Sequence, residues 1–77
     1  MAIMLDLRQA VVHKMYGRDQ QGLRELIEGS IDAQEAALPG LGVAFEIIWK
    51  RLESAKQDEL VAVLNQALQA NPPKPIR

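Results

Sequence analysis

The stretch LPGLGVAFEIIW, residues 38–49, constrains the fold more than any other part of the chain. It opens with helix-breaking Pro-Gly-Leu-Gly and continues as an almost wholly apolar segment. The apolar stripe predicted from helical spacing consists of Leu41, Ala44, Phe45, Ile48 and Leu52, and Ile47 and Trp49 widen it. We expect such a helix to be covered nearly all round. Phe45→Ala should then cost about 3–5 kcal/mol. Gly40 and Gly42 should admit a closely packed backbone from the same chain.

Helix caps and helix breakers predict two helices before this stretch. Asp6 can cap a first helix that runs to about Tyr16, where Gly17 fits its C-terminal stop. Asp19 can cap a second helix that runs to about Ala33. The link between the two helices is short, which favours a helical hairpin or a sharp corner.

Two further helices and a tail complete the predicted architecture. Pro39 suits the first position of the third helix and pushes Leu38 towards extended geometry. Ser54, with Gln57 as its capping-box partner, predicts a fourth helix that ends at about Ala70. We therefore expect an all-α fold, a small bundle of about four short helices forming a single domain over residues 1–70. The proline-rich tail, residues 71–77, is expected to be flexible.

The small size of the chain predicts self-association. At 77 residues, a single core rarely supplies more than about 3–5 kcal/mol of stability. The chain has no cysteine, so neither a disulfide nor a thiolate metal site can reinforce it. The first helix has apolar residues on two sides, and one side would need a partner. We therefore favour a homodimer, with Val12, Tyr16 and Trp49 as candidate contact residues, although Trp49 fits the core equally well.

No arrangement of side chains in the sequence predicts catalysis. His13 is the only histidine, and it has no serine or cysteine partner in a recognisable nucleophile motif, so we expect it at the surface or in an interface. The acidic residues around the second helix have the spacing of a solvated face, without a calcium-loop pattern. Gly-Leu-Gly is too short to cradle a phosphate. We expect no enzyme activity, no catalytic residue, no cofactor, no metal site and no small-molecule substrate.

The charge balance disfavours nucleic-acid binding. The chain has nine Lys and Arg against ten Asp and Glu, and its pI is about 5.7, whereas proteins that neutralise phosphates usually carry a basic excess. Any nucleic-acid contacts would come from Arg8, Lys14, Arg18, Lys50 and Arg51. The apolar start, MAIMLDL, is too short to span a membrane and lacks the basic cluster of a signal peptide. We expect an intracellular protein without a membrane segment.

Several motifs resemble one known family. Leu38-Pro39-Gly40-Leu41-Gly42-Val43, followed by Phe45-Glu46 and Trp49, is similar to the signature of the minor small, acid-soluble spore proteins of type I from endospore-forming Firmicutes. The resemblance extends to Asp6-Leu7-Arg8-Gln9-Ala10-Val11 and covers nearly the whole chain, apart from the lead at residues 1–5 and the NPPKPIR tail. It implies synthesis in the developing spore and residence in the cytoplasmic spore core. It does not imply the DNA coating carried out by the major alpha/beta-type spore proteins, which form a different family.

Three hypotheses follow for the function. The leading one is a non-enzymatic spore-core protein involved in sporulation that acts as a small self-associating helical module. An adaptor for another spore-core protein differs only in which partner covers the exposed faces. The alternative is a nucleic-acid accessory protein that binds spore DNA, which requires the Arg and Lys residues to gather on one face of an oligomer.

Overall fold

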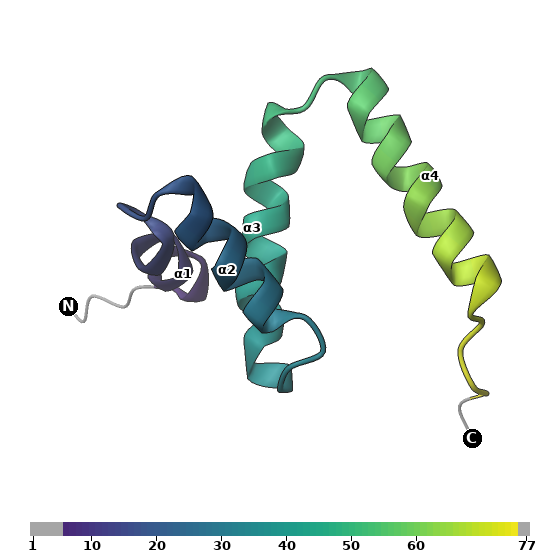
Figure 1. Ribbon diagram of the computed structural model, residues 1–77, viewed down its shortest axis with the longest axis horizontal. Helices are drawn as coiled ribbons and strands as arrows, with labels where there is room; N and C mark the ends of the chain where they lie inside the picture. The colour runs from purple at the N-terminus through teal and green to yellow at the C-terminus, as the bar shows by residue number, and fades with distance from the viewer. Residues whose placement is uncertain (1–5, 76–77) are drawn as a thin grey trace.

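The described part of the chain is entirely helical apart from its links and tail. The computed structural model describes residues 6–75, and over that range it contains four α-helices, one short 3₁₀ helix and no strand (Figure 1). The elements are α1 (Leu7–Met15), α2 (Gln20–Ser30), η1 (Glu35–Ala37), α3 (Leu38–Arg51) and α4 (Ser54–Ala70). The prediction of an all-α fold with four short helices is confirmed.

The first two helices begin where the sequence predicts. The side chain of Asp6 accepts a hydrogen bond from the backbone N–H of Gln9 at 2.8 Å, and Asp19 accepts one from Gly22 at the same distance. Each cap satisfies an N–H that has no partner within its helix. Gly17 has a φ of 89°, a value that an L-residue adopts only with strain, so it ends the first helix as expected.

The second helix ends three residues earlier than predicted. It stops at Ser30 because Ile31 is extended, with φ −71° and ψ 129°, and Asp32 has a φ of 57°. Aspartate tolerates the left-handed region better than most residues, so ending the helix here costs little free energy. The prediction that the helix continues to Ala33 is therefore wrong.

The start of α3 also differs from the prediction. Leu38 is helical, with φ −60° and ψ −41°, because the 3₁₀ turn formed by residues 35–37 leads directly into the helix. Pro39 lies in the first turn, where its missing N–H leaves no helical bond unmade. The preference of a residue before proline for extended geometry is overridden here by the continuing helical turn.

The corner between α3 and α4 consists of two extended residues. Leu52 has φ −88° and ψ 141°, and Glu53 has φ −73° and ψ 164°. The predicted capping box is wrong, because Glu53 occupies the cap position without a side-chain bond and Ser54 is already helical. The side-chain amide Nε2 of Gln57 instead donates to the backbone carbonyl oxygen of Trp49 at 2.9 Å. Gln57 thus ties the first turn of α4 to the last turn of α3. The end of α4 at Ala70 agrees with the prediction.

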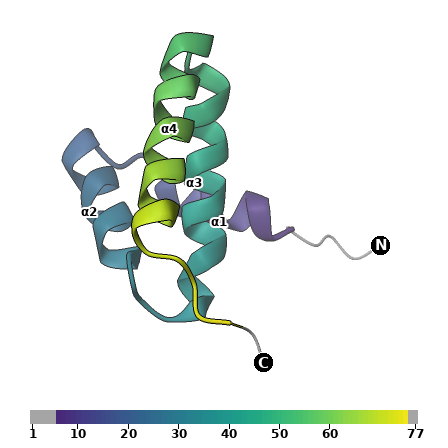
Figure 2. The same ribbon diagram turned by 90° about the vertical axis from the view of Figure 1, so that its right-hand side faces the viewer.

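Helices α1 and α2 pack against α3, whereas α4 packs closely against none of them. Figures 1 and 2 show α4 leaving the top of α3 and descending apart from it, on the side opposite α1. Within residues 6–75 only Val43 and Ala44 are buried among the hydrophobic residues, at 8% and 7% exposure. Residues 71–75 continue beyond α4 as exposed chain without helix or strand. The core is therefore much smaller than the sequence suggests.

The expectation that helix α3 is covered nearly all round is wrong for the single chain. Phe45 is 50% exposed, and Ile47 and Ile48 are exposed as well. The reason is the corner at residues 52–53, which directs α4 away from α3 and leaves one side of α3 open. The cost expected for Phe45→Ala rested on a buried ring, so that value does not apply to the isolated chain. A Cβ added at Gly40 or Gly42 would meet no atom within 4 Å, so the expected close approach is not made.

Two alanine substitutions with opposite expected effects test these helix boundaries. Gly17→Ala should destabilise the fold by about 1–2 kcal/mol, because an L-residue is strained at a positive φ. Gly29→Ala should stabilise it by about 0.5–1 kcal/mol, since alanine is the better helix former. A Cβ at position 29 meets no atom within 4 Å. Denaturant unfolding followed by far-UV circular dichroism measures both changes, and two shifts in the same direction would contradict the assignment.

Candidate functional site: the open face of α3 and the apolar stripe of α4

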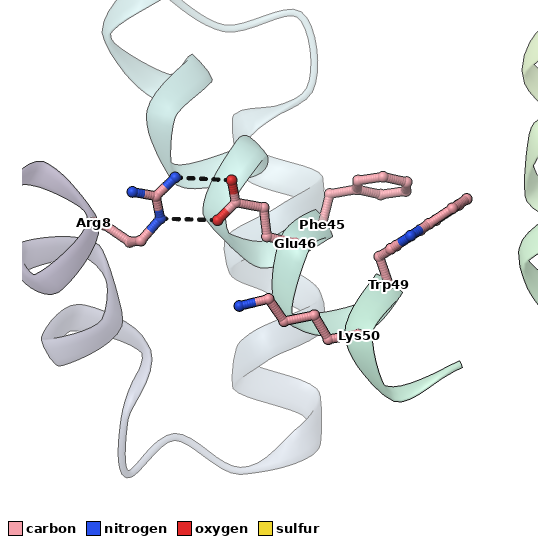
Figure 3. Close-up of a pocket in the computed structure, with 5 residues that line it drawn as sticks. All are labelled: Arg8, Phe45, Glu46, Trp49 and Lys50. Atoms are coloured by element: carbon pink, nitrogen blue, oxygen red, sulfur yellow. Dashed lines mark hydrogen bonds and ion pairs between the residues drawn. The ribbon is translucent and has the colours of Figure 1, made fainter. Parts of the chain in front are cut away.

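The two large aromatic residues of α3 lie together on its open side. The ring centroids of Phe45 and Trp49, one helical turn apart, are separated by 5.5 Å with a tilt of 39° between the ring planes. Figure 3 shows both rings pointing away from Arg8 of α1, on the side of α3 where α4 lies. With Ile48, which is also exposed, they form what we call the α3 face. Phe45 and Ile48 stay exposed within the described chain and Trp49 is half-buried, although all three belong to the most apolar helix.

An ion pair fixes the side of α3 that faces α1. Arg8 donates from Nε to Oε1 of Glu46 and from Nη2 to Oε2, both at 2.9 Å (Figure 3). This two-pronged geometry orients both groups more strictly than a single contact does. Arg8, Glu46 and Lys50 line, together with Phe45 and Trp49, an open pocket of about 590 Å³. The α3 face is thus bordered by charge along the edge next to α1.

The ion pair shifts the pKa values of both partners. Hydrogen bonds from Arg8 lower the pKa of Glu46, partial desolvation opposes this shift, and the charges of Arg8 and Lys50 add to it. The hydrogen bond to Glu46 and its negative charge raise the pKa of Arg8 further. Arg8 lies 38 residues from Glu46 in the sequence. Because no local spacing connects such distant residues, the pair could not be predicted from the sequence.

Helix α4 carries a matching apolar surface. Leu60, Val63, Leu64, Ala67 and Leu68 recur at helical spacing on one side, and all five are exposed. We call these five residues the α4 stripe. Gln57 is seven residues, or about two turns, before Leu64, so it lies on the same side of the helix. Since Gln57 reaches back to Trp49, the α4 stripe starts on the side of α4 that is turned towards α3.

The structure separates the residues predicted to mediate self-association. Trp49 lies half-buried near the end of α3, Val12 is half-buried in α1, and Tyr16 is 87% exposed. Figure 3 shows Trp49 pointing away from α1, the helix that carries Val12. The larger apolar surface comes from Phe45 and Ile48, which were expected to be covered, and from the α4 stripe.

The basic residues also form separate groups. Arg8 is engaged by Glu46. Arg18 donates from Nε to the backbone carbonyl of Lys14 at 3.0 Å, at the end of α1. Lys50 and Arg51 lie in the last turn of α3, and Lys50 lines the same open pocket as Arg8. Of the five predicted nucleic-acid contacts, Arg8 and Lys50 thus share a pocket, where Arg8 is already paired.

Residues 6–75 contain no group of three or more His, Cys, Asp or Glu that could hold a metal ion. In the same part of the chain, no helix has both the length and the apolarity to cross a membrane. His13 is exposed on α1. The features that remain as a candidate functional site are the α3 face and the α4 stripe.

These features define a small all-α protein with two uncovered apolar helix surfaces and a very small core. The chain belongs to the small, acid-soluble spore protein I family, whose family model matches residues 5–68. A small, acid-soluble spore protein I from Bacillus licheniformis is 39% identical over 67 residues, which cover 86% of this chain and 96% of the relative. The proteins of the same name from Bacillus mycoides and Bacillus cereus are each 41% identical over 64 residues, which cover 82% of this chain and 93% of each relative. No solved structure matches the chain.

The family assignment confirms the resemblance drawn from the LPGLGV motif and identifies the chain as a spore protein. The match leaves residues 1–4 and 69–77 outside. These segments include most of the lead and the entire tail, where the sequence departs from the family pattern. The α3 face and the α4 stripe both lie inside the matched range, which ends at Leu68, the last residue of the stripe.

The lowered pKa of Glu46 predicts a specific pH dependence of stability. The ionised carboxylate stabilises the folded chain above its ordinary pKa of 4.5, and this contribution is lost as the pH falls through the lower folded value. Glu46→Gln should therefore reduce the free energy of unfolding at neutral pH, and the difference from the wild type should disappear in strong acid. Denaturant unfolding at a series of pH values measures this difference.

Asp58→Asn is the matched control. Asp58 lies on α4 and makes no salt bridge with any residue between positions 6 and 75. Its replacement should leave the pH profile of stability close to that of the wild type. Equal profiles for the two variants would show that the Arg8–Glu46 pair contributes nothing specific.

Proposed function

We propose that this chain is a non-enzymatic protein of the spore core that acts by self-association of its helices, most simply as a homodimer. Membership of the spore protein family supports the setting. The uncovered α3 face supports the association. No convergent set of titratable or nucleophilic groups within the described residues suggests a reaction.

The observation that carries the proposal is the mismatch between apolar content and burial. Hydrophobic residues make up 48% of the chain, yet only Val43 and Ala44 are buried among the described ones. Burial stabilises by about 25 cal/mol per Å² of apolar surface, so a chain that leaves one side of its most apolar helix open forgoes the stability that covering this side would contribute. A second copy that covers Phe45, Ile48 and Trp49 restores that contribution.

The observations support the two alternative functions less well. An adaptor for another spore-core protein would use the same surfaces, but the partner's side of that contact is not found on this chain. A nucleic-acid accessory protein needs a basic face. Arg8 is already paired. Of the other four basic residues, Lys14 and Arg18 come from the end of α1, whereas Lys50 and Arg51 come from the end of α3.

Sedimentation equilibrium at micromolar concentration tests self-association. The wild type should sediment with about twice the 8.6 kDa mass of one chain. Ile48→Asp should sediment as a monomer, because it places a charge in the α3 face. Ile31→Asp is the matched control: Ile31 is likewise exposed but lies just after α2, so this variant should remain a dimer. A folded wild type that stays monomeric refutes the proposal.

A gel-shift titration separates the proposal from nucleic-acid binding. With a double-stranded DNA fragment at low and at moderate salt, we expect no shift at either concentration. Binding that weakens steeply with salt would indicate phosphate contacts and favour the nucleic-acid accessory protein. Lys50→Gln combined with Arg51→Gln should then weaken the shift.

A further inference from the structure

The chain is more extended than its length requires. Its radius of gyration is 15.3 Å, whereas a compact domain of this length has a radius of about 11.5 Å. Figure 1 shows the reason: α1, α2 and α3 are gathered together, and α4 stands apart from them as a second arm. The α3–α4 pair is an open V.

The exposed area is large enough for a dimer. A compact domain made of residues 7–70 exposes about 4,100 Å², and the remaining residues add at most about 2,100 Å² as extended chain. The measured surface is 7008 Å², which leaves roughly 800 Å² in excess of these two amounts. One partner of a standard-size protein interface buries about 800 Å².

The corner holds the V open. Both corner residues, Leu52 and Glu53, are extended, and the hydrogen bond from Gln57 to Trp49 joins the first turn of α4 to the end of α3. Folding α4 back onto its own α3 would require a new backbone path through these two residues. It would also move Gln57 relative to Trp49 and so disturb the hydrogen bond between them.

The two inner sides of the V are both apolar. Phe45 and Trp49 point away from α1 (Figure 3), towards the side on which α4 lies (Figure 1). The α4 stripe shares its side of the helix with Gln57, which reaches towards α3. At 1.5 Å per residue, the 14 residues of α3 and the 17 residues of α4 span about 21 Å and about 25 Å. The two surfaces are thus similar in length as well as in character.

We propose that the α4 stripe of one chain packs on the α3 face of a second copy, and that the second copy's α4 packs reciprocally on the first. This inference rests on the proposed self-association and specifies how it occurs. Each chain provides one α3 face and one α4 stripe, so a two-fold symmetric exchange covers both surfaces on both chains. An unrelated partner would have to supply both a helix for the α3 face and a separate face for α4.

Cysteine cross-linking tests the exchange directly, since the wild-type chain has no cysteine. Position 45 is seven residues before Leu52, and position 60 is seven residues after Glu53, so the two lie at the same distance from the corner. Full-length Phe45→Cys and Leu60→Cys are purified reduced, and each is checked for dimer formation by sedimentation. They are then oxidised in a glutathione buffer, alone and as an equal mixture. Mass spectrometry identifies the products.

We expect the mixture to form a cross-link between position 45 of one chain and position 60 of the other. Random subunit exchange makes mixed dimers about half of the total, which sets the maximum yield. Each variant oxidised alone should remain mostly uncross-linked. Glu28→Cys, on the outer side of α2, is the matched control and should not cross-link with Leu60→Cys. If either main variant is monomeric, Leu41→Cys with Leu64→Cys, both eleven residues from the corner, replaces the pair.

The contrary outcomes separate the exchange from self-association itself. Efficient cross-linking of Phe45→Cys alone would mean that two α3 faces meet, which overturns the exchange but keeps the dimer. A chain that carries both Phe45→Cys and Leu60→Cys is oxidised separately. A disulfide that closes within one such chain would mean that α4 folds back onto its own α3, and this also overturns the exchange. A mixture that cross-links no better than the control overturns it as well. Only a monomeric wild type removes the proposed function too.

Discussion

The two-residue corner at Leu52 and Glu53 decides what kind of molecule this chain becomes. Because both residues are extended and Gln57 holds the start of α4 to Trp49, α4 cannot lie along α3 as it does in a closed helical bundle. The consequence is an apolar helix with one side packed by α1 and α2 and the other side open. The small core, the exposed ring of Phe45 and the large surface all follow from that single bend.

The Arg8–Glu46 pair acts on the packed side of α3. Both groups are largely exposed, so the pair adds little net stability to the chain. Its effect is geometric: the two parallel hydrogen bonds set where α1 lies along α3. Ile27 of α2 lines one pocket with four residues of α3, Leu41, Ala44, Phe45 and Ile48, so α2 borders the α3 face. The charged side chains beside it, Glu46 and Lys50, limit where an apolar partner can lie.

Local signals in the sequence predicted local structure well. Asp6, Asp19 and Gly17 act within one helical turn, and their roles follow from short-range hydrogen bonding and backbone geometry. The sequence failed where the outcome depends on distant groups. Gln57 has the spacing of a capping partner, yet it bonds a carbonyl eight residues back. Helical spacing identified the apolar stripe of α3. Periodicity shows which residues share an apolar side, but it does not show whether another helix of the same chain packs on that side.

Charge explains how two such apolar surfaces can belong to a family named for solubility in acid. Near neutrality the nine Lys and Arg almost balance the ten Asp and Glu, so electrostatic repulsion between copies is weak and apolar association can proceed. In acid the carboxylates become neutral while the nine Lys and Arg stay positive. The resulting repulsion opposes close approach of two chains, and Glu46 loses the charge that pairs it with Arg8. Acid therefore weakens the contact that orients α1 and opposes the proposed association of the open faces, without making the apolar surface any smaller.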